Sequence, residues 1–113
     1  MNILEHLEKT SPISYRAFVP TKSGKLMMSV IAGPYTYCSP KQFFENVETY
    51  KSLEVGLFNK ETGDWASYNE AKPVLELFDG EREYDETEQP DVPQNVVFGY
   101  VPVADINKAW EIL

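Results

Sequence analysis

Regular alternation of apolar and polar side chains, broken by turn sequences, restricts this chain to a sheet built from antiparallel strands. In residues 50–68, YKSLEVGLFNKETGDWASY, the side chains of Leu53, Val55 and Leu57 would share one face of a strand. The stretch NKETGD then supplies turn residues, and Trp65 begins a second apolar run. We therefore predict a β-hairpin over this segment.

A second hairpin is predicted over residues 13–32. The run ISYRAFV alternates in the same way, the turn sequence TKSGK contains Gly24, and the run KLMMSVIA then resumes a strand. A further strand pattern, NVVFGYVPV, has Pro102 near its end, so we expect this strand at an edge of the sheet or ending there. The run KPVLELF fits either another strand or, with the preceding YNEA, a short helix.

Helical periodicity marks both ends of the chain. Ile3 and Leu7 lie about one helical turn apart, and the Ser-Pro pair at residues 11–12 ends this run. In INKAWEIL the apolar residues recur with the spacing i, i+3, i+4, i+7, and Asp105 precedes them as an N-cap. We predict a short N-terminal helix and a C-terminal helix that starts after Asp105.

The stretch GPYTYCSPKQFFENVE contains a candidate third helix. Ser39 fits an N-cap, Pro40 fits the first helical position, and Gln42 completes a capping box. The alternative is an irregular loop rich in aromatic residues. If the helix forms, Cys38 lies just before it, where the helix dipole would favour a reactive thiolate. Lone cysteines are more often buried as small apolar residues, so Cys38 also fits the core.

Together these elements predict a single α+β domain over residues 1–113, with an antiparallel sheet of about five or six strands and two or three short helices. A length of 113 residues is close to the commonest domain size and is enough to bury one core. Strands do not alternate with helices over the length of a βαβ unit. This disfavours a Rossmann-type nucleotide-binding fold.

Several features predict a soluble cytoplasmic protein that does not contact a membrane. Cys38 is the only cysteine, so no intrachain disulfide can form and a reducing compartment is expected. The N-terminal sequence MNILEHLEKTSP contains charged residues where a secretory signal needs an unbroken apolar stretch. No apolar run approaches the roughly 18 to 20 residues of a membrane-spanning helix.

The chain lacks the residue sets of most catalytic and cofactor sites, and we predict that it is not an enzyme. His6 is the only histidine, and one histidine with one cysteine cannot form the usual zinc ligand sets. Neither a Walker loop nor a GxGxxG motif occurs in the sequence. We therefore expect no cofactor and no metal. The alternative from this class is a small enzyme that uses Cys38 or carboxylates.

Negative charge is concentrated in one segment. Residues 1–60 carry seven Lys/Arg and five Asp/Glu, whereas residues 61–113 carry three and thirteen. The stretch from Asp79 to Asp91, here called the acidic segment, has seven carboxylates and one arginine, which is −6 of the chain's net charge of −8. Such a chain is repelled by nucleic acid and anionic membranes, and is attracted to basic surfaces.

Other interpretations of the acidic segment stay open. It could be a solvated loop, or cations of the N-terminal half could neutralise it, namely Arg16, Lys22, Lys25 and Lys41. As a calcium-binding EF-hand loop it has Tyr84 where glycine is required and Pro90 where glutamate is required. As an extended strand it would place like charges about 6.7 Å apart on one side, which imitates a nucleic-acid backbone only partly.

We predict a small binding or inhibitory module that engages the basic surface of another protein, including one that itself binds nucleic acid. Small acidic inhibitors from phages and mobile elements share this profile, an association by size and charge alone. The predicted contact residues are Asp79, Glu81, Glu83, Tyr84, Asp85, Glu86, Glu88 and Asp91.

Two further surfaces are candidates for contact. Tyr35 and Tyr37 would share one face of an extended segment and form a second binding surface. Strand edges in residues 50–68 and 95–103 give the alternative function, a structural or assembly subunit that forms a homo-oligomer. The oligomeric state distinguishes this alternative from the binding module.

Overall fold

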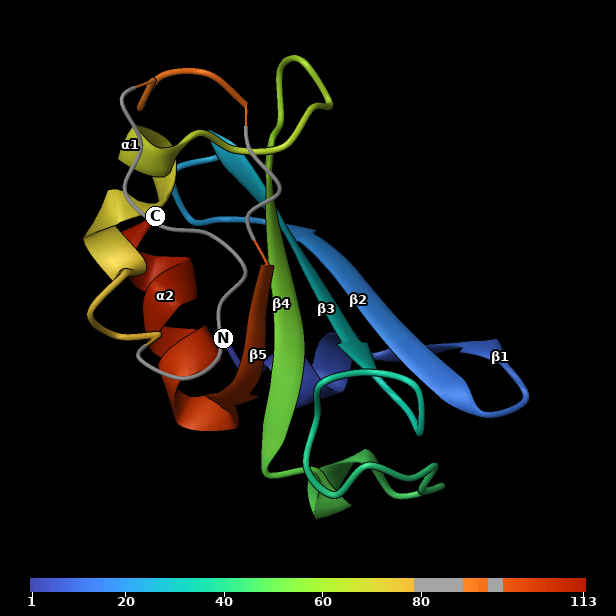
Figure 1. Ribbon diagram of the computed structural model, residues 1–113. Coiled ribbons are helices and arrows are strands. Elements are labelled where there is room, and N and C mark those ends of the chain that lie inside the picture. Colours follow the sequence, from blue (N-terminus) through green and yellow to red (C-terminus); the bar gives the residue numbers. More distant parts are fainter. Residues whose placement is uncertain (79–88, 94–96) are drawn as a thin grey trace.

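The computed structural model describes residues 1–78, 89–93 and 97–113, and its sheet is a meander of five antiparallel strands in the order β1-β2-β3-β4-β5 (Figure 1). The strands are β1 (Glu8–Ser11), β2 (Ser14–Pro20), β3 (Leu26–Ala32), β4 (Ser52–Asn59) and β5 (Val97–Pro102). The helical elements are η1 (Ile3–His6), η2 (Val47–Thr49), α1 (Tyr68–Ala71), η3 (Lys72–Val74) and α2 (Val103–Ile112), where η denotes a 3-10 helix. The predicted α+β class and antiparallel sheet are confirmed, with the lower of the two expected strand numbers.

The predicted hairpin at residues 13–32 is confirmed by β2 and β3. These strands pair in regular register, and the turn between them is closed by the Thr21 N–H, which donates to the Leu26 carbonyl at 2.9 Å. Gly24 has a φ of 77° in this turn, a conformation that glycine adopts without steric cost. Burial alternates along both strands and fixes the register, because a slip of one residue would expose the core face.

The hairpin predicted over residues 50–68 is only half present. Its first strand is β4, but Trp65 forms a single bridge to Phe58 and does not start a returning strand. The chain turns into α1 immediately afterwards, because Ser67 caps that helix through a capping box with Glu70. β4 therefore pairs with β5, which comes from near the end of the chain.

β5 lies at one edge of the sheet, as the position of Pro102 predicts. Its pairing with β4 shifts register near Glu54, where Gly99 and Tyr100 form a bulge. Tyr100 has a φ of 55°, which is rare for a bulky residue. Its N–H donates to the Tyr37 carbonyl at 2.9 Å, so a neighbouring loop satisfies the backbone where the ladder is interrupted.

The other helical predictions are partly right. η1 is a single 3-10 turn, and the chain then forms β1, which was not predicted because residues 8–11 show no apolar alternation. α2 starts at Val103, so Asp105 lies in its first turn and does not cap it. The region that fitted either strand or helix forms α1 and η3, which together span residues 68–74.

The helix predicted to start at Ser39 is wrong, and residues 39–46 form the irregular aromatic loop that was the alternative. The cause is Tyr50, whose hydroxyl donates to the Gln42 carbonyl at 2.6 Å and accepts from the Phe44 N–H at 3.2 Å. These bonds satisfy backbone groups that a helix would otherwise pair. Burial raises the pKa of the Tyr50 hydroxyl above its ordinary value of 10.0.

The core lies on one face of the sheet, and α1, η3 and α2 gather on one side of it (Figure 1). Apolar residues of β2 to β5 are buried there together with Ile106 and Ala109 of α2. The Ile3 N–H donates to Asn107 Oδ1 at 2.8 Å and joins η1 to α2. No helix in the described part of the chain is long and apolar enough to cross a membrane.

Candidate functional site

Most of the predicted contact residues lie outside the residues that the structure describes, and their role stays a prediction. These are Asp79, Glu81, Glu83, Tyr84, Asp85, Glu86 and Glu88. Asp91 is described and is exposed. The structure shows how the chain on either side of these residues is attached to the body.

Both flanks of the acidic segment are held by the folded body. Before it, Phe78 is buried and packs edge to face against Phe98, with ring centroids 4.9 Å apart. At its end, Asp91 Oδ1 accepts from Asn69 Nδ2 at 2.7 Å, and the Pro90 carbonyl accepts from the Asn69 N–H at 3.0 Å. Because Asn69 belongs to α1, the acidic segment rejoins the body at that helix.

The four cations considered as internal partners of the acidic segment have other surroundings. Arg16 Cζ lies 4.9 Å from the ring centroid of Phe18, and Lys41 Nζ lies 5.2 Å from that of Tyr37. The other two are exposed between β2 and β3, at Lys22 and Lys25. None of the four forms an ion pair with a carboxylate in residues 1–78, 89–93 or 97–113.

The second candidate surface, Tyr35 and Tyr37, lies in a series of turns between β3 and β4. Tyr35 is 88% exposed, whereas Tyr37 is 38% exposed and packs against Tyr100 with ring centroids 6.0 Å apart. A Cβ added to Gly99 would meet Tyr37 Cβ at 2.9 Å, so the close approach of Tyr37 requires glycine there. The Tyr37 N–H donates to Glu54 Oε1 at 3.1 Å. Tyr37 is therefore fixed beside the bulge of β5, and Tyr35 projects into solvent.

Cys38 does not lie at a helix N-terminus, since the predicted helix after it does not form. The residue is 1% exposed, and its Sγ lies 3.3 Å from the Gly33 carbonyl oxygen and 3.4 Å from the Pro40 carbonyl oxygen. His6 is exposed on η1. Within the described residues, no group of three or more His, Cys, Asp or Glu side chains is placed to hold a metal ion.

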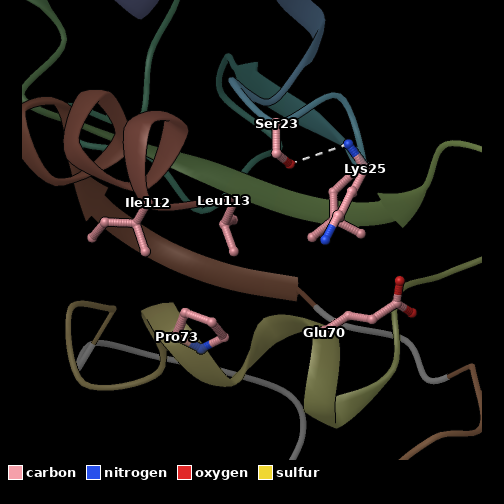
Figure 2. Close-up of a pocket in the computed structure, with 7 residues that line it drawn as sticks. Ser23, Lys25, Glu70, Pro73, Ile112 and Leu113 are labelled. Carbon is pink, nitrogen blue, oxygen red and sulfur yellow. Dashed lines mark hydrogen bonds between the residues drawn. The ribbon is translucent and has the colours of Figure 1, made fainter.

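A depression lies between the β2–β3 turn, α1, η3 and the end of α2 (Figure 2). Its volume is about 250 Å³, and it is lined by Ser23, Lys25, Leu26, Glu70, Pro73, Ile112 and Leu113. Both carboxylate oxygens of Glu70 are used in folding: Oε1 accepts from the Ser67 N–H at 3.0 Å and Oε2 accepts from Asn59 Nδ2 at 2.8 Å. The Glu70 carboxylate therefore already has structural hydrogen-bond partners. We interpret the depression as a gap in the packing between these elements and not as a binding site.

A row of aromatic rings lies on the sheet face opposite the core, and sequence reasoning missed it. Phe18 of β2 and Phe58 of β4 meet edge to face with centroids 6.0 Å apart, and Phe58 stacks on Trp65 at 4.3 Å. Trp65 lies over Gly56, where an added Cβ would come within 3.4 Å of the indole ring. Phe18 is 50% exposed, and the other two rings are half-buried. We call Phe18, Phe58 and Trp65 the aromatic row.

The sequence contains a signal for this row. In ISYRAFV, Phe18 falls in phase with Arg16 and out of phase with the buried Tyr15 and Ala17. Phe58 likewise falls in phase with a glutamate and a glycine of β4. When an aromatic residue occupies the same alternate positions of a strand as the polar residues, its side chain is predicted to lie on the solvent-facing side of the sheet. A large apolar side chain exposed in this way is a marker of a binding surface.

Comparisons with known proteins leave the function open. No family model matches the chain, and no curated protein sequence or solved structure matches it. Any functional proposal must therefore rest on the residues and contacts of this chain.

Proposed function

We propose that the protein is a binding or inhibitory module that engages the basic surface of a partner protein through the acidic segment. The observation that carries this proposal is the distribution of charge: the thirteen positions from Asp79 to Asp91 hold −6 of a net charge of −8. Opposite charges on two surfaces accelerate their encounter and select the partner.

The attachment of the acidic segment supports this proposal. Phe78 is buried on one side, and Asn69 bonds to Pro90 and Asp91 on the other. A segment fastened at both ends loses less conformational entropy on binding than a free tail would. The cations Arg16 and Lys41 lie over aromatic rings of their own half of the chain.

The edges of the sheet favour this function over assembly into a homo-oligomer through strand pairing. β1 is four residues long, carries Glu8 and Lys9, and its pairing with β2 is irregular. β5 contains the bulge at Tyr100 and ends in Pro102, which has no N–H to donate. Short strands, charges, bulges and proline are the features by which natural edges resist pairing. We therefore expect a monomer in light scattering, and a stable dimer or tetramer would favour the assembly alternative.

The test of the proposed function is charge reversal within the acidic segment. We expect the triple variant Glu81→Lys, Glu83→Lys, Asp85→Lys to weaken partner capture by about tenfold or more, since three exposed ion pairs contribute roughly 0.5 kcal/mol each. It should also flatten the salt dependence of binding. The measurement is affinity purification from the native host cell at two salt concentrations.

A control variant with the same change in net charge shows whether the loss of binding depends on where the charges lie or only on the total charge. It replaces three exposed carboxylates outside the segment by lysine, at Glu45, Glu61 and Glu111. Partner capture by the control should stay close to that of the wild type. Equal capture by both variants would show that the acidic segment is not the binding element.

A further inference from the structure

We propose that the aromatic row is a second contact for the same basic partner and that it binds arginine side chains in preference to lysine side chains. The inference rests on the proposed function, because the occupant of the row is the partner that the acidic segment attracts. It adds a defined surface on the described part of the molecule and the chemistry that this surface recognises.

The rings of the row stand beside small residues. Ser29 of β3 pairs with Phe18 on one side and with Gly56 on the other, and Gly56 is buried beneath the Trp65 indole. The small side chain next to Phe18 is therefore that of Ser29, and Phe18 presents half of its surface to solvent. A flat group can approach this exposed half of the ring.

The molecule itself provides an example of the proposed contact. The guanidinium of Arg16 lies over the Phe18 ring, with Cζ 4.9 Å from the centroid. This distance is within the range in which a ring attracts a cation. The geometry around Phe18 is therefore compatible with a guanidinium group, and the ring remains 50% exposed with Arg16 in place.

Charge selects the occupant among the molecules that could cover an aromatic face. Single-stranded nucleic acid also stacks on aromatic rows, but its phosphates are repelled by the acidic segment, whose last residue, Asp91, bonds to Asn69 four residues after Trp65. A second copy of the chain carries the same net charge of −8 and is repelled likewise. A basic segment of a partner protein is attracted. Arginine suits the rings better than lysine, because its planar guanidinium is less strongly hydrated and stacks on aromatic faces.

The row also lies close to the end of the acidic segment. Trp65 is two residues before Ser67, which forms a bridge with Pro93, and Asn69 in the same turn of chain bonds to Asp91. The end of the acidic segment and one end of the row are therefore attached to the same few residues. A basic partner that meets the acidic segment would bring further cations next to Trp65.

The experiment compares an oligoarginine peptide with an oligolysine peptide of equal length and charge, titrated by calorimetry into the full chain and its variants. We expect the wild type to bind oligoarginine about two- to fivefold more tightly, the factor that a cation–π contribution of about 0.5–1 kcal/mol gives. Phe18→Leu keeps an apolar side chain without a ring and should lower this preference, because Phe18 is the most exposed ring of the row. Phe18→Tyr restores the ring and should restore it.

A matched control comes from the other side of the molecule. Ile112 is 49% exposed on α2, and Ile112→Ala should leave the preference for oligoarginine unchanged. The Trp65 indole N–H resonance, followed by NMR, should shift with oligoarginine more than with oligolysine. This second readout also establishes that each variant is folded.

The outcomes separate this inference from the proposed function. If Phe18→Leu retains the preference, or the wild type has none, the aromatic row does not bind arginine, although the acidic segment can still attract both peptides. If the triple charge reversal leaves both affinities unchanged, the proposed function itself is wrong. Tighter binding of an oligothymidine than of oligoarginine, or self-association that Phe18→Leu abolishes, would assign the face to a different occupant and overturn the inference.

Discussion

The two faces of the sheet use the same strands for different purposes, and β4 shows this within adjacent residues. Val55 and Leu57 point into the core and are fully buried, whereas Phe58 points the other way and stacks on Trp65 at the surface. An antiparallel sheet can leave one face to water, and that face is usually polar. Here it carries large rings. The covered face holds the core, and the uncovered face is the one to which we assign arginine binding.

The largest expected effect tests this division within β4. Leu57→Ala should lower the free energy of unfolding by about 2–5 kcal/mol, as for other buried leucines, because it leaves a cavity in the core. Phe58→Ala should cost about half as much or less, because the ring is only half-buried. Urea unfolding of both variants gives the comparison. A greater loss for Phe58→Ala would mean that the uncovered face carries the stability.

A smaller effect distinguishes two parts of the uncovered face. Gly99→Ala should destabilise the fold by about 1–3 kcal/mol, because the new Cβ would overlap Tyr37, and this is the usual cost of overpacking. Gly56→Ala should stay within about 1 kcal/mol of the wild type, since its Cβ meets Trp65 at ordinary contact distance and alanine suits a strand better than glycine. Thermal unfolding of the pair measures the difference. Equal losses of stability in the two variants would mean that the loop carrying Tyr37 moves away from the added methyl group at little cost.

The smallest expected effect is on the pH dependence of stability, and it concerns Tyr50, which bonds to the irregular aromatic loop of residues 39–46. Because the folded state raises the pKa of Tyr50 above 10.0, this residue contributes stability that is fully present below about pH 10 and is lost as the pH rises through the folded pKa. Unfolding midpoints in urea should therefore fall between about pH 9 and 11. Tyr50→Phe should reduce this pH dependence, because it removes the ionising hydroxyl. An unchanged slope in that variant would assign the effect to other groups.

Sequence reasoning succeeded where a local pattern and the tertiary environment agree. The β2–β3 hairpin was predictable because alternation, a glycine-containing turn and a second apolar run all specify one register. The edge position of β5 was predictable from Pro102, because proline has no N–H to donate to a neighbouring strand in any sheet. The C-terminal helix followed from its apolar spacing, although its start was misjudged by three residues.

Sequence reasoning failed where a side chain from elsewhere replaces a local signal. Ser39, Pro40 and Gln42 have the residue types of a helix start, but the Tyr50 hydroxyl takes the hydrogen bonds of the loop backbone. β1 was missed because its residues are polar and it depends on β2 for pairing. Of the candidate site, the position of Asp91 is now known. The aromatic row was not predicted, because Phe18 and Phe58 meet only through the strand order β2-β3-β4.

The meander order has a consequence for biosynthesis. The strands β1 to β4 lie within residues 8–59 and can pair in the order in which the ribosome releases them. β5 and α2 are made after the other elements, and until they arrive β4 is an outer strand with unpaired backbone groups and uncovered apolar residues. We expect the nascent chain to be most prone to mispairing in this interval, which ends when residues 97–113 have left the exit tunnel.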